Sequence, residues 1–154
     1  MKIMSKQHRG FTLIELLVVV SIIAILIVVV FESLDPLKQF REARNSRRWS
    51  QVNTLSTGIY RYIIEKGRYP IGLSDLTQQL GTAKSDCDLN CPGAESKCLD
   101  IQADVIDYLP ILPTELNGGS AEKTGYTISK NSSNNVITIS SCGAENGASI
   151  FIMR

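Results

Sequence analysis

The stretch "RGFTLIELLVVVSIIAILIVVVF" (residues 9–31) decides the fold of this chain. From Phe11 to Phe31 it runs for 21 residues, and only Thr12, Glu15 and Ser21 are not apolar. A helix of that length, at about 1.5 Å per residue, matches a hydrocarbon core roughly 30 Å thick. The stretch therefore predicts a helix that crosses a membrane, with a carboxylate near its start.

The residues on either side of this run predict its orientation. Lys2, Lys6 and Arg9 precede it with no acidic residue, so the N-terminus should stay in the cytoplasm and the rest should be exported. A secretory signal peptide has a shorter apolar core of about 7–15 residues and a small-residue cleavage site. The bulky, charged "FESLDPLKQFREAR" that follows does not fit that pattern.

Glu15 is the residue that a plain membrane anchor does not explain. A carboxylate at the centre of a membrane helix costs about 2.5–3.5 kcal/mol, and less near a helix end, where the side chain reaches the interface. An ionisable group inside such a segment is by default a functional hypothesis that needs a named partner. The anchor interpretation therefore stays open, but it leaves Glu15 without a role.

The sequence "GFTLIE" (residues 10–15), with its basic leader and apolar run, resembles the class III signal of type IV pilins and pseudopilins. The resemblance implies that a prepilin peptidase cleaves after Gly10 and N-methylates Phe11. It also implies that Glu15 meets the Phe11 amine of a neighbouring subunit, a charge-assisted pair that low dielectric strengthens. Further implied partners are an assembly ATPase, an inner-membrane platform protein and membrane lipid before assembly.

The function that follows is that of a structural subunit of a type IV pilus-like filament, made of copies of this chain or of mixed subunits. A pseudopilin of a type II secretion or DNA-uptake apparatus is the alternative within the family. The second alternative is a monomeric, signal-anchored surface binding protein that keeps its leader and tolerates replacement of Glu15. The expected location is the cytoplasmic membrane, single-pass, and then an extracellular or periplasmic filament.

The rest of the chain divides at recognisable breaks. Residues 1–10 are expected to be a removed leader, 11–31 the transmembrane and filament-core helix, 32–66 its amphipathic continuation, and 67–154 a globular cap. Asp35-Pro36 predicts a kink or a brief interruption in one long helix that runs from Phe11 to Lys66, because proline removes a backbone donor. After the kink, helical spacing relates a row of residues: Leu37, Phe40, Arg44, Arg48, Val52, Leu55, Ile59, Tyr62 and Ile63.

The cap reads as a small α+β domain. "LSDLTQQL" (residues 73–80) predicts a short helix with Ser74 as its N-cap, and residues 100–108 predict another helical turn or two. "GYTISK" and "NVITIS" alternate apolar and polar residues around "NSSN" and predict an antiparallel hairpin, with "ASIFIM" as a third strand. A long helix followed by an antiparallel sheet is also the pilin-like arrangement that the resemblance implies.

Four cysteines, Cys87, Cys91, Cys98 and Cys142, lie in the exported part. An even number in an oxidising compartment predicts two disulfides, and the sequence leaves all three connectivities open. The family resemblance implies that one bridge ties Cys142 to the loop between Cys87 and Cys98. A zinc site is the less favoured alternative, because the spacing lacks the paired pattern of zinc ribbons.

Two other groups of polar and charged residues are candidate binding sites. Glu115, Asn117, Ser120 and Glu122 offer oxygen ligands for calcium, but their spacing fits a turn better. The resemblance favours a pilus subunit over the major pseudopilin of a secretion system. The four cysteines and the "AR..RR" pattern of residues 43–48 look more like pilins, and the major pseudopilin typically has a calcium loop, whose regular spacing is missing here.

The segment "KQFREARNSRR" (residues 38–48) contains five basic side chains. An ordinary helix face is favoured over a phosphate-binding strip for these residues: Lys38, Arg41, Arg44, Arg47 and Arg48.

The sequence predicts no enzyme, no cofactor and no metal. His8, the single histidine, lies in the leader, so a triad of the usual kind is missing, and no glycine-rich phosphate loop occurs. Asp104 and Asp107 are interpreted as an exposed helix face rather than an acid–base pair. Loss of Lys2, Lys6 and Arg9 leaves 13 basic against 15 acidic residues, which disfavours nucleic acid as a partner.

Overall fold

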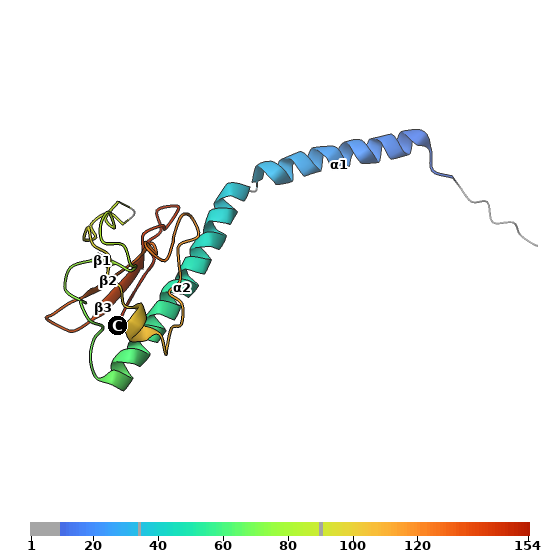
Figure 1. Ribbon diagram of the computed structural model, residues 1–154. Helices are drawn as coiled ribbons and strands as arrows, with labels where there is room; N and C mark the ends of the chain where they lie inside the picture. Colours follow the sequence, from blue (N-terminus) through green and yellow to red (C-terminus); the bar gives the residue numbers. More distant parts are fainter. Residues whose placement is uncertain (1–9, 34, 90) are drawn as a thin grey trace, which may run out of the picture. The chain divides into compact units, whose positions relative to one another are not determined.

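The computed structural model describes residues 10–33, 35–89 and 91–154 (Figure 1). The chain forms two compact units, one that ends at Leu37 and one from Lys38 to Arg154. The first unit contains helix α1 (Leu13–Ser33), and the described side chains from Phe11 to Glu32 are all exposed. Within the described ranges, α1 is the single helix with the length and apolar composition to cross a membrane. The predicted apolar helix is confirmed.

Helix α2 (Pro36–Lys66) begins at the predicted interruption. Asp35 lies outside both helices, so the structure has two helices where the sequence predicts one kinked helix. Proline suits the first position of α2, because its fixed φ and missing N–H cost nothing there. At the other end, Gly67 adopts φ +65° and its N–H bonds to the Ile63 carbonyl at 2.9 Å, a glycine C-cap.

The second unit contains a four-stranded antiparallel sheet in the order β1-β2-β3-β4. The predicted hairpin is confirmed as β2 (Tyr126–Lys130) and β3 (Ile137–Ser141), which pair with Ile128 opposite Ile139. The predicted third strand is β4 (Phe151–Met153), antiparallel to β3. The fourth strand, β1 (Gln78–Gln79), pairs with β2 and is not predicted by the sequence.

The short helix predicted over residues 73–80 is wrong. The segment makes turns and then β1, and the Leu80 N–H donates to the Tyr126 carbonyl at 2.8 Å. Ser74 Oγ accepts from the Leu76 N–H, a local turn rather than a helix cap. Pairing with β2 lets Gln79 and Leu80 become fully buried, and this non-local gain outweighs the local helical pattern. The helical turn predicted near residue 104 is confirmed as α3 (Gln102–Val105).

The core lies between α2 and one face of the sheet. Val52, Leu55, Ile59 and Tyr62 form the buried face of α2, which confirms the apolar part of the predicted row, whereas Leu37 and Phe40 are exposed. The sheet contributes the alternate residues that point toward α2, and loop residues close the sides: Tyr126, Ile128, Ile137, Ile139, Leu80, Leu99, Ile101, Val105, Leu109, Leu112 and Ile150. Figure 1 shows α2 running along this sheet. The predicted α+β class is confirmed.

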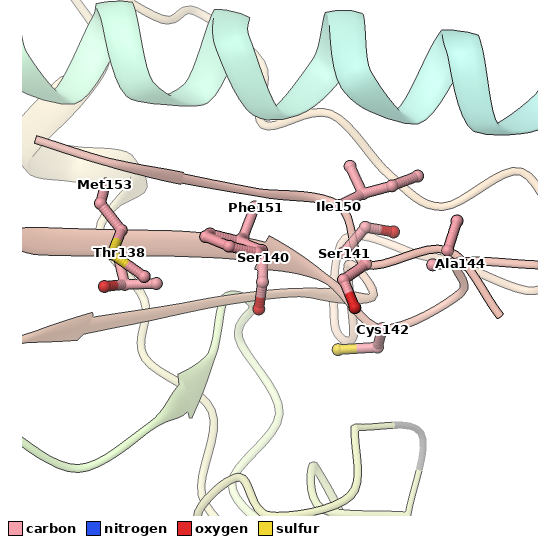
Figure 2. A pocket seen from close by; sticks show the side chains of 10 residues that line it. Thr138, Ser140, Ser141, Cys142, Ala144, Ile150, Phe151 and Met153 are labelled. Atoms are coloured by element: carbon pink, nitrogen blue, oxygen red, sulfur yellow. The ribbon is translucent and has the colours of Figure 1, made fainter.

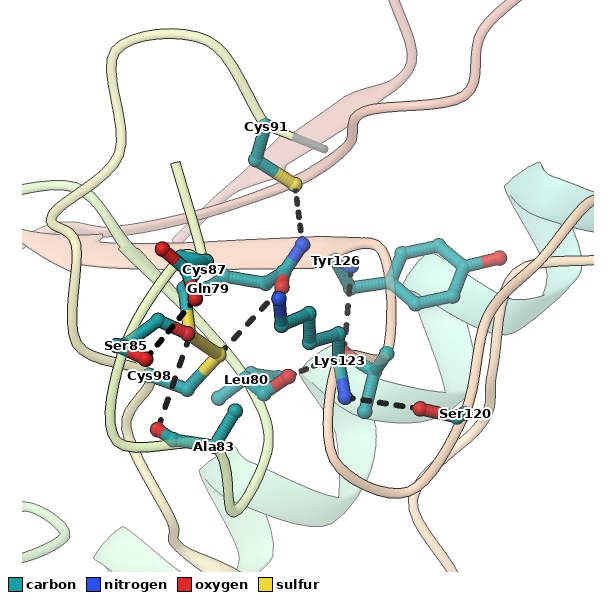
Figure 3. Close-up of a disulfide and its surroundings, with 12 residues drawn as sticks. Gln79, Leu80, Ala83, Ser85, Cys87, Cys91, Cys98, Ser120, Lys123 and Tyr126 are labelled. Carbon is teal, nitrogen blue, oxygen red and sulfur yellow. Dashed lines mark hydrogen bonds between the residues drawn. A yellow bond between two sulfur atoms is a disulfide. The ribbon is translucent and has the colours of Figure 1, made fainter. Parts of the chain in front are cut away.

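Two disulfides close the cap, as the sequence predicts. Cys87 bonds to Cys98, and Cys91, inside that loop, bonds to Cys142. The fully buried side chain of Gln79 lies at the two bridges, with its amide nitrogen 2.9 Å from Cys91 Sγ (Figure 3). The link from Cys142 to the Cys87–Cys98 loop is therefore the one that the family resemblance implied, and Cys91 makes it.

Candidate functional site

The first turn of α1 places Glu15 in a local hydrogen-bonded pair with Thr12. The Glu15 N–H donates to Thr12 Oγ1 at 3.3 Å, and the Thr12 N–H donates to Glu15 Oε2 at 3.4 Å. This reciprocal arrangement of an N-cap threonine and a glutamate three residues later is a capping box. The signature Thr-x-x-Glu is readable in the sequence, and our sequence analysis missed it. Glu15 therefore has a role inside its own chain, at the positive end of the helix dipole.

Beyond this turn, α1 presents apolar side chains around its whole circumference. A helix that is hydrophobic on all sides requires burial in lipid or among other helices. Ser21, a polar residue inside the run, donates its hydroxyl hydrogen to the Leu17 carbonyl at 2.8 Å, so it needs no outside partner. Leu13, Ile25 and Phe31 are each exposed over 65% or more of their surface, and this apolar exposure requires a lipid or protein environment around the helix.

Gly10 and Phe11 precede the helix and are exposed. Among the described residues, none beyond its chain neighbour has an atom within 4 Å of the position that a Gly10 Cβ would take. The peptide bond between these two residues lies outside helices and strands. The predicted leader up to Arg9 lies outside the described residues.

The basic row at the start of α2 is divided. Arg44 and Arg48 are packed into the cap, whereas Lys38, Arg41 and Arg47 are exposed. Arg48 is fully buried, with Nε 2.9 Å from Glu115 Oε1 and Nη2 2.8 Å from the same oxygen. Arg48 also contacts Glu145 at 3.2 Å, and Arg44 forms a two-point pair with Glu145 at 2.8 and 2.9 Å. Asn45 donates to the Glu145 carbonyl at 2.9 Å. We call Arg44, Asn45, Arg48, Glu115 and Glu145 the ion-pair cluster.

Glu115 is the buried carboxylate of this cluster, and hydrogen bonds from outside the cluster also hold it. Its carboxylate accepts the Leu116 N–H at 2.8 Å and the Ser141 hydroxyl at 3.2 Å in addition to Arg48. A Cβ on Gly143 would lie 2.5 Å from Glu115 Oε2, and one on Gly125 would lie 2.6 Å from Glu115 Cβ. Both glycines therefore allow the backbone to close around the buried carboxylate.

The hydrogen bonds of Glu115 and Ser120 make the proposed calcium site less favourable. Glu115, the first candidate ligand, has its oxygens committed to Arg48, Leu116 and Ser141. Ser120 builds a turn, because its N–H bonds to the Lys123 carbonyl at 2.9 Å. Among the residues that the structure describes, no three His, Cys, Asp or Glu side chains gather as a metal site would require.

Asp104 differs from its predicted role as part of an exposed face. Its side chain is only 15% exposed and accepts hydrogen bonds from the Tyr62 hydroxyl at 3.2 Å and the Ile71 N–H at 2.8 Å. Arg68 Nη2 lies 3.3 Å away. Asp104 thus ties α3 to the segment after α2, while Asp107 is exposed.

We expect the ion-pair cluster to make stability depend on acid pH. The hydrogen bond from Arg44 lowers the pKa of Glu145 below its ordinary 4.5. The stabilisation is therefore complete above that value and is lost as the pH falls through the lower, folded-state pKa. Urea unfolding of the full chain and of Glu145→Gln should differ at neutral pH and converge once the pH is below the lowered pKa of Glu145. A difference that persists at that pH would contradict this account.

Comparisons with known proteins agree with the N-terminal geometry. The family described as "Prokaryotic N-terminal methylation motif" matches residues 5–31, which include Gly10, Phe11, Glu15 and most of α1. Neither the curated proteins nor the solved structures gave a match. The fold adds a second helix packed on an antiparallel sheet, which is the pilin-like α+β arrangement. The chain thus carries the prokaryotic N-terminal methylation motif, the class III prepilin signal, as type IV pilins and pseudopilins do.

Proposed function

We propose that this protein is a structural subunit of a type IV pilus-like filament. In this proposal a prepilin peptidase cuts after Gly10 and methylates Phe11, and subunits then assemble through α1. The observation that carries the proposal is the helix Leu13–Glu32, apolar and exposed on all sides, most of which lies within the matched methylation motif. Such a surface is satisfied first by lipid and then by the same helix of other subunits.

Glu15 would have two partners in the assembled filament. Cleavage leaves a protonated amine on Phe11, close to a helix N-terminus where a positive charge is unfavourable. A neighbour's Glu15 can neutralise that amine, and the pair is strong because the surroundings are apolar. The capping box with Thr12 supports this role, since it fixes the direction of the carboxylate before assembly.

Among filament types we favour a pilus over a secretion or DNA-uptake pseudopilus. The engagement of Glu115 with Arg48 leaves the candidate calcium loop without its first ligand, and two disulfides close the cap. An assembly ATPase and an inner-membrane platform protein would supply energy and guidance. The precursor would sit in the cytoplasmic membrane with its N-terminus in the cytoplasm.

The test of processing is the N-terminal peptide and the intact mass of the protein recovered from a host that has a prepilin peptidase. We expect a chain that begins at methylated Phe11. A chain that still begins at Met1, in a host that processes another prepilin, would contradict the proposal and favour a signal-anchored monomer.

We expect Glu15→Gln to insert in the membrane but to lower filament yield about tenfold, the effect of losing about 1.4 kcal/mol per added subunit. Glutamine keeps the capping-box hydrogen bond and removes only the charge. The yield is measured on sheared filaments by immunoblot, relative to membrane-bound precursor.

Thr12→Val is the matched control for Glu15→Gln. It removes the capping hydroxyl and keeps the carboxylate, so we expect filament yield near that of the unmodified chain. If Thr12→Val abolishes filaments while Glu15→Gln does not, Glu15 acts as a helix cap alone. If neither change lowers filament yield, the proposed pairing of Glu15 with the Phe11 amine is contradicted.

A further inference from the structure

The β4 edge of the sheet has unpaired backbone groups. Ile137 and Arg154 exchange two backbone hydrogen bonds, at 2.6 and 3.0 Å, and the Ser141 N–H donates to the Ile150 carbonyl at 2.9 Å. Because an antiparallel ladder alternates, residues between these pairs point their N–H and C=O groups alternately toward and away from β3. Phe151 and Met153 therefore direct their backbone groups away from the sheet, and the described residues provide no hydrogen-bond partner for them.

The opposite edge of the sheet is closed. The Leu99 N–H donates to the Gln79 carbonyl at 2.7 Å, and the Glu95 N–H donates to the Thr77 carbonyl at 2.8 Å. The Cys87–Cys98 disulfide fixes the segment that makes these contacts. Within the described part of the chain, the sheet is therefore open along β4 alone, and an open edge is a template for another strand.

The side chains of β4 would allow another strand to pair with this edge and do not block such pairing. Phe151 and Met153 are 42% and 58% exposed, on the sheet face that points away from α2. No charged side chain or proline blocks these positions, the usual ways in which an edge is protected. Figure 2 shows that the two side chains border a shallow pocket, which the small side chains of Thr138 and Ser140 also line.

We propose that β4 pairs with β4 of a second copy of this chain, antiparallel and with the two-fold axis at Ile152. In this register Phe151 of each copy lies opposite Met153 of the other copy, which makes two symmetry-related pairs. In each pair the free N–H and C=O groups of the two residues face each other across the interface. About four backbone hydrogen bonds result, because each opposed pair exchanges two. The edge is thus complementary to itself, as a two-fold interface requires.

The register also brings compatible side chains together. Phe151 and the partner copy's Met153 lie on the same face, where a sulfur–aromatic contact is favourable. Arg154 lies opposite Ile150, so no like charges meet across the axis. β4 is only three residues long, so we expect a reversible contact that depends on concentration. The proposal needs only a second copy and does not depend on filament assembly.

The test uses two full-length variants in detergent micelles, Phe151→Cys and Met153→Cys. All four native cysteines are held in disulfides, so each variant has one free thiol. Opposed residues lie about 5.5 Å apart between Cα atoms, within disulfide range, whereas diagonal residues lie about 7–8 Å apart. Under mild oxidation we expect the mixture to give a disulfide dimer of the two variants and each variant alone to give little.

A second measurement separates strand pairing from association through α1. Ile152→Cys places a thiol on the axis, where opposed Cα atoms are about 4.5 Å apart. Ile152→Cys is combined with Met153→Pro, which should break the pairing, or with Met153→Ala as the matched control. Because the Met153 N–H points away from β3, proline removes only the bond to the partner copy. We expect the disulfide dimer with Met153→Ala and its loss with Met153→Pro.

Two results would overturn the proposal. One is a mixture that yields no more dimer than the separate variants, which would mean random collision or a different occupant of the edge. The other is an Ile152→Cys dimer that proline leaves unchanged. Both experiments compare chains that have the same α1. Failure of filament assembly would therefore not change the interpretation of either dimer yield.

Discussion

Replacing Arg48 with alanine is expected to lower the free energy of unfolding by about 3–5 kcal/mol, the cost of leaving a buried ion without its partner. The arginine is fully buried and Glu115 is 8% exposed, so water cannot replace the lost guanidinium. The glycines at 125 and 143 close the backbone around the carboxylate and leave it no room to turn outward. Urea unfolding of the full chain in detergent, followed by tyrosine and tryptophan fluorescence, measures the loss.

Arg47→Ala is the matched control for Arg48→Ala. Arg47 is the residue directly before Arg48 in α2, has the same chemistry and is exposed, so we expect a change within about 0.5 kcal/mol. The double change Arg48→Met with Glu115→Leu removes both charges and should recover most of the loss, because an apolar pair of similar volume is often neutral or stabilising. A small effect of Arg48→Ala, or no recovery in the double variant, would contradict a buried pair.

Arg48 also shows what the sequence could and could not predict. It lies four residues before Val52, on the row that continues through Leu55 and Ile59, and this spacing is a readable sign of a cation on a buried face. The acidic partners of Arg48 could not be predicted from helical spacing. Glu115 and Glu145 follow it by 67 and 97 residues, and only the folded sheet brings their loops to α2.

The N-terminal helix was predictable because its signal is local and strong. A long apolar run needs no partner elsewhere in the chain to be recognised, and the hairpin of β2 and β3 has a similarly local alternation. Residues 73–80 show the opposite case. Their leucine spacing favours a helix, yet backbone pairing of Leu80 with Tyr126 and of Leu99 with Gln79 draws the segment into the sheet. For residues 73–80, contacts with distant segments therefore determine the secondary structure, and a local sequence pattern cannot predict it.

Removing the Cys91–Cys142 disulfide by changing both residues to alanine is expected to lower the free energy of unfolding by about 4 kcal/mol, against about 3 kcal/mol for Cys87 and Cys98. The two bridges span 51 and 11 residues. A longer closed loop restricts the unfolded chain more, so its loss costs more in the chain-entropy account. Urea unfolding of both double variants at equal protein concentration gives the comparison.

The position of Cys142 adds a consequence that loop length alone does not predict. Its N–H donates to the Gly125 carbonyl at 3.0 Å, and Glu145 of the ion-pair cluster follows three residues later. Loosening this loop should weaken the Arg44–Glu145 pair, so Arg44→Ala should cost less in the Cys91, Cys142 double variant than in the unmodified chain. The Cys87, Cys98 double variant is the control, where the cost of Arg44→Ala should be unchanged. Equal costs in all three backgrounds would mean that the bridge stabilises the cap without positioning Glu145.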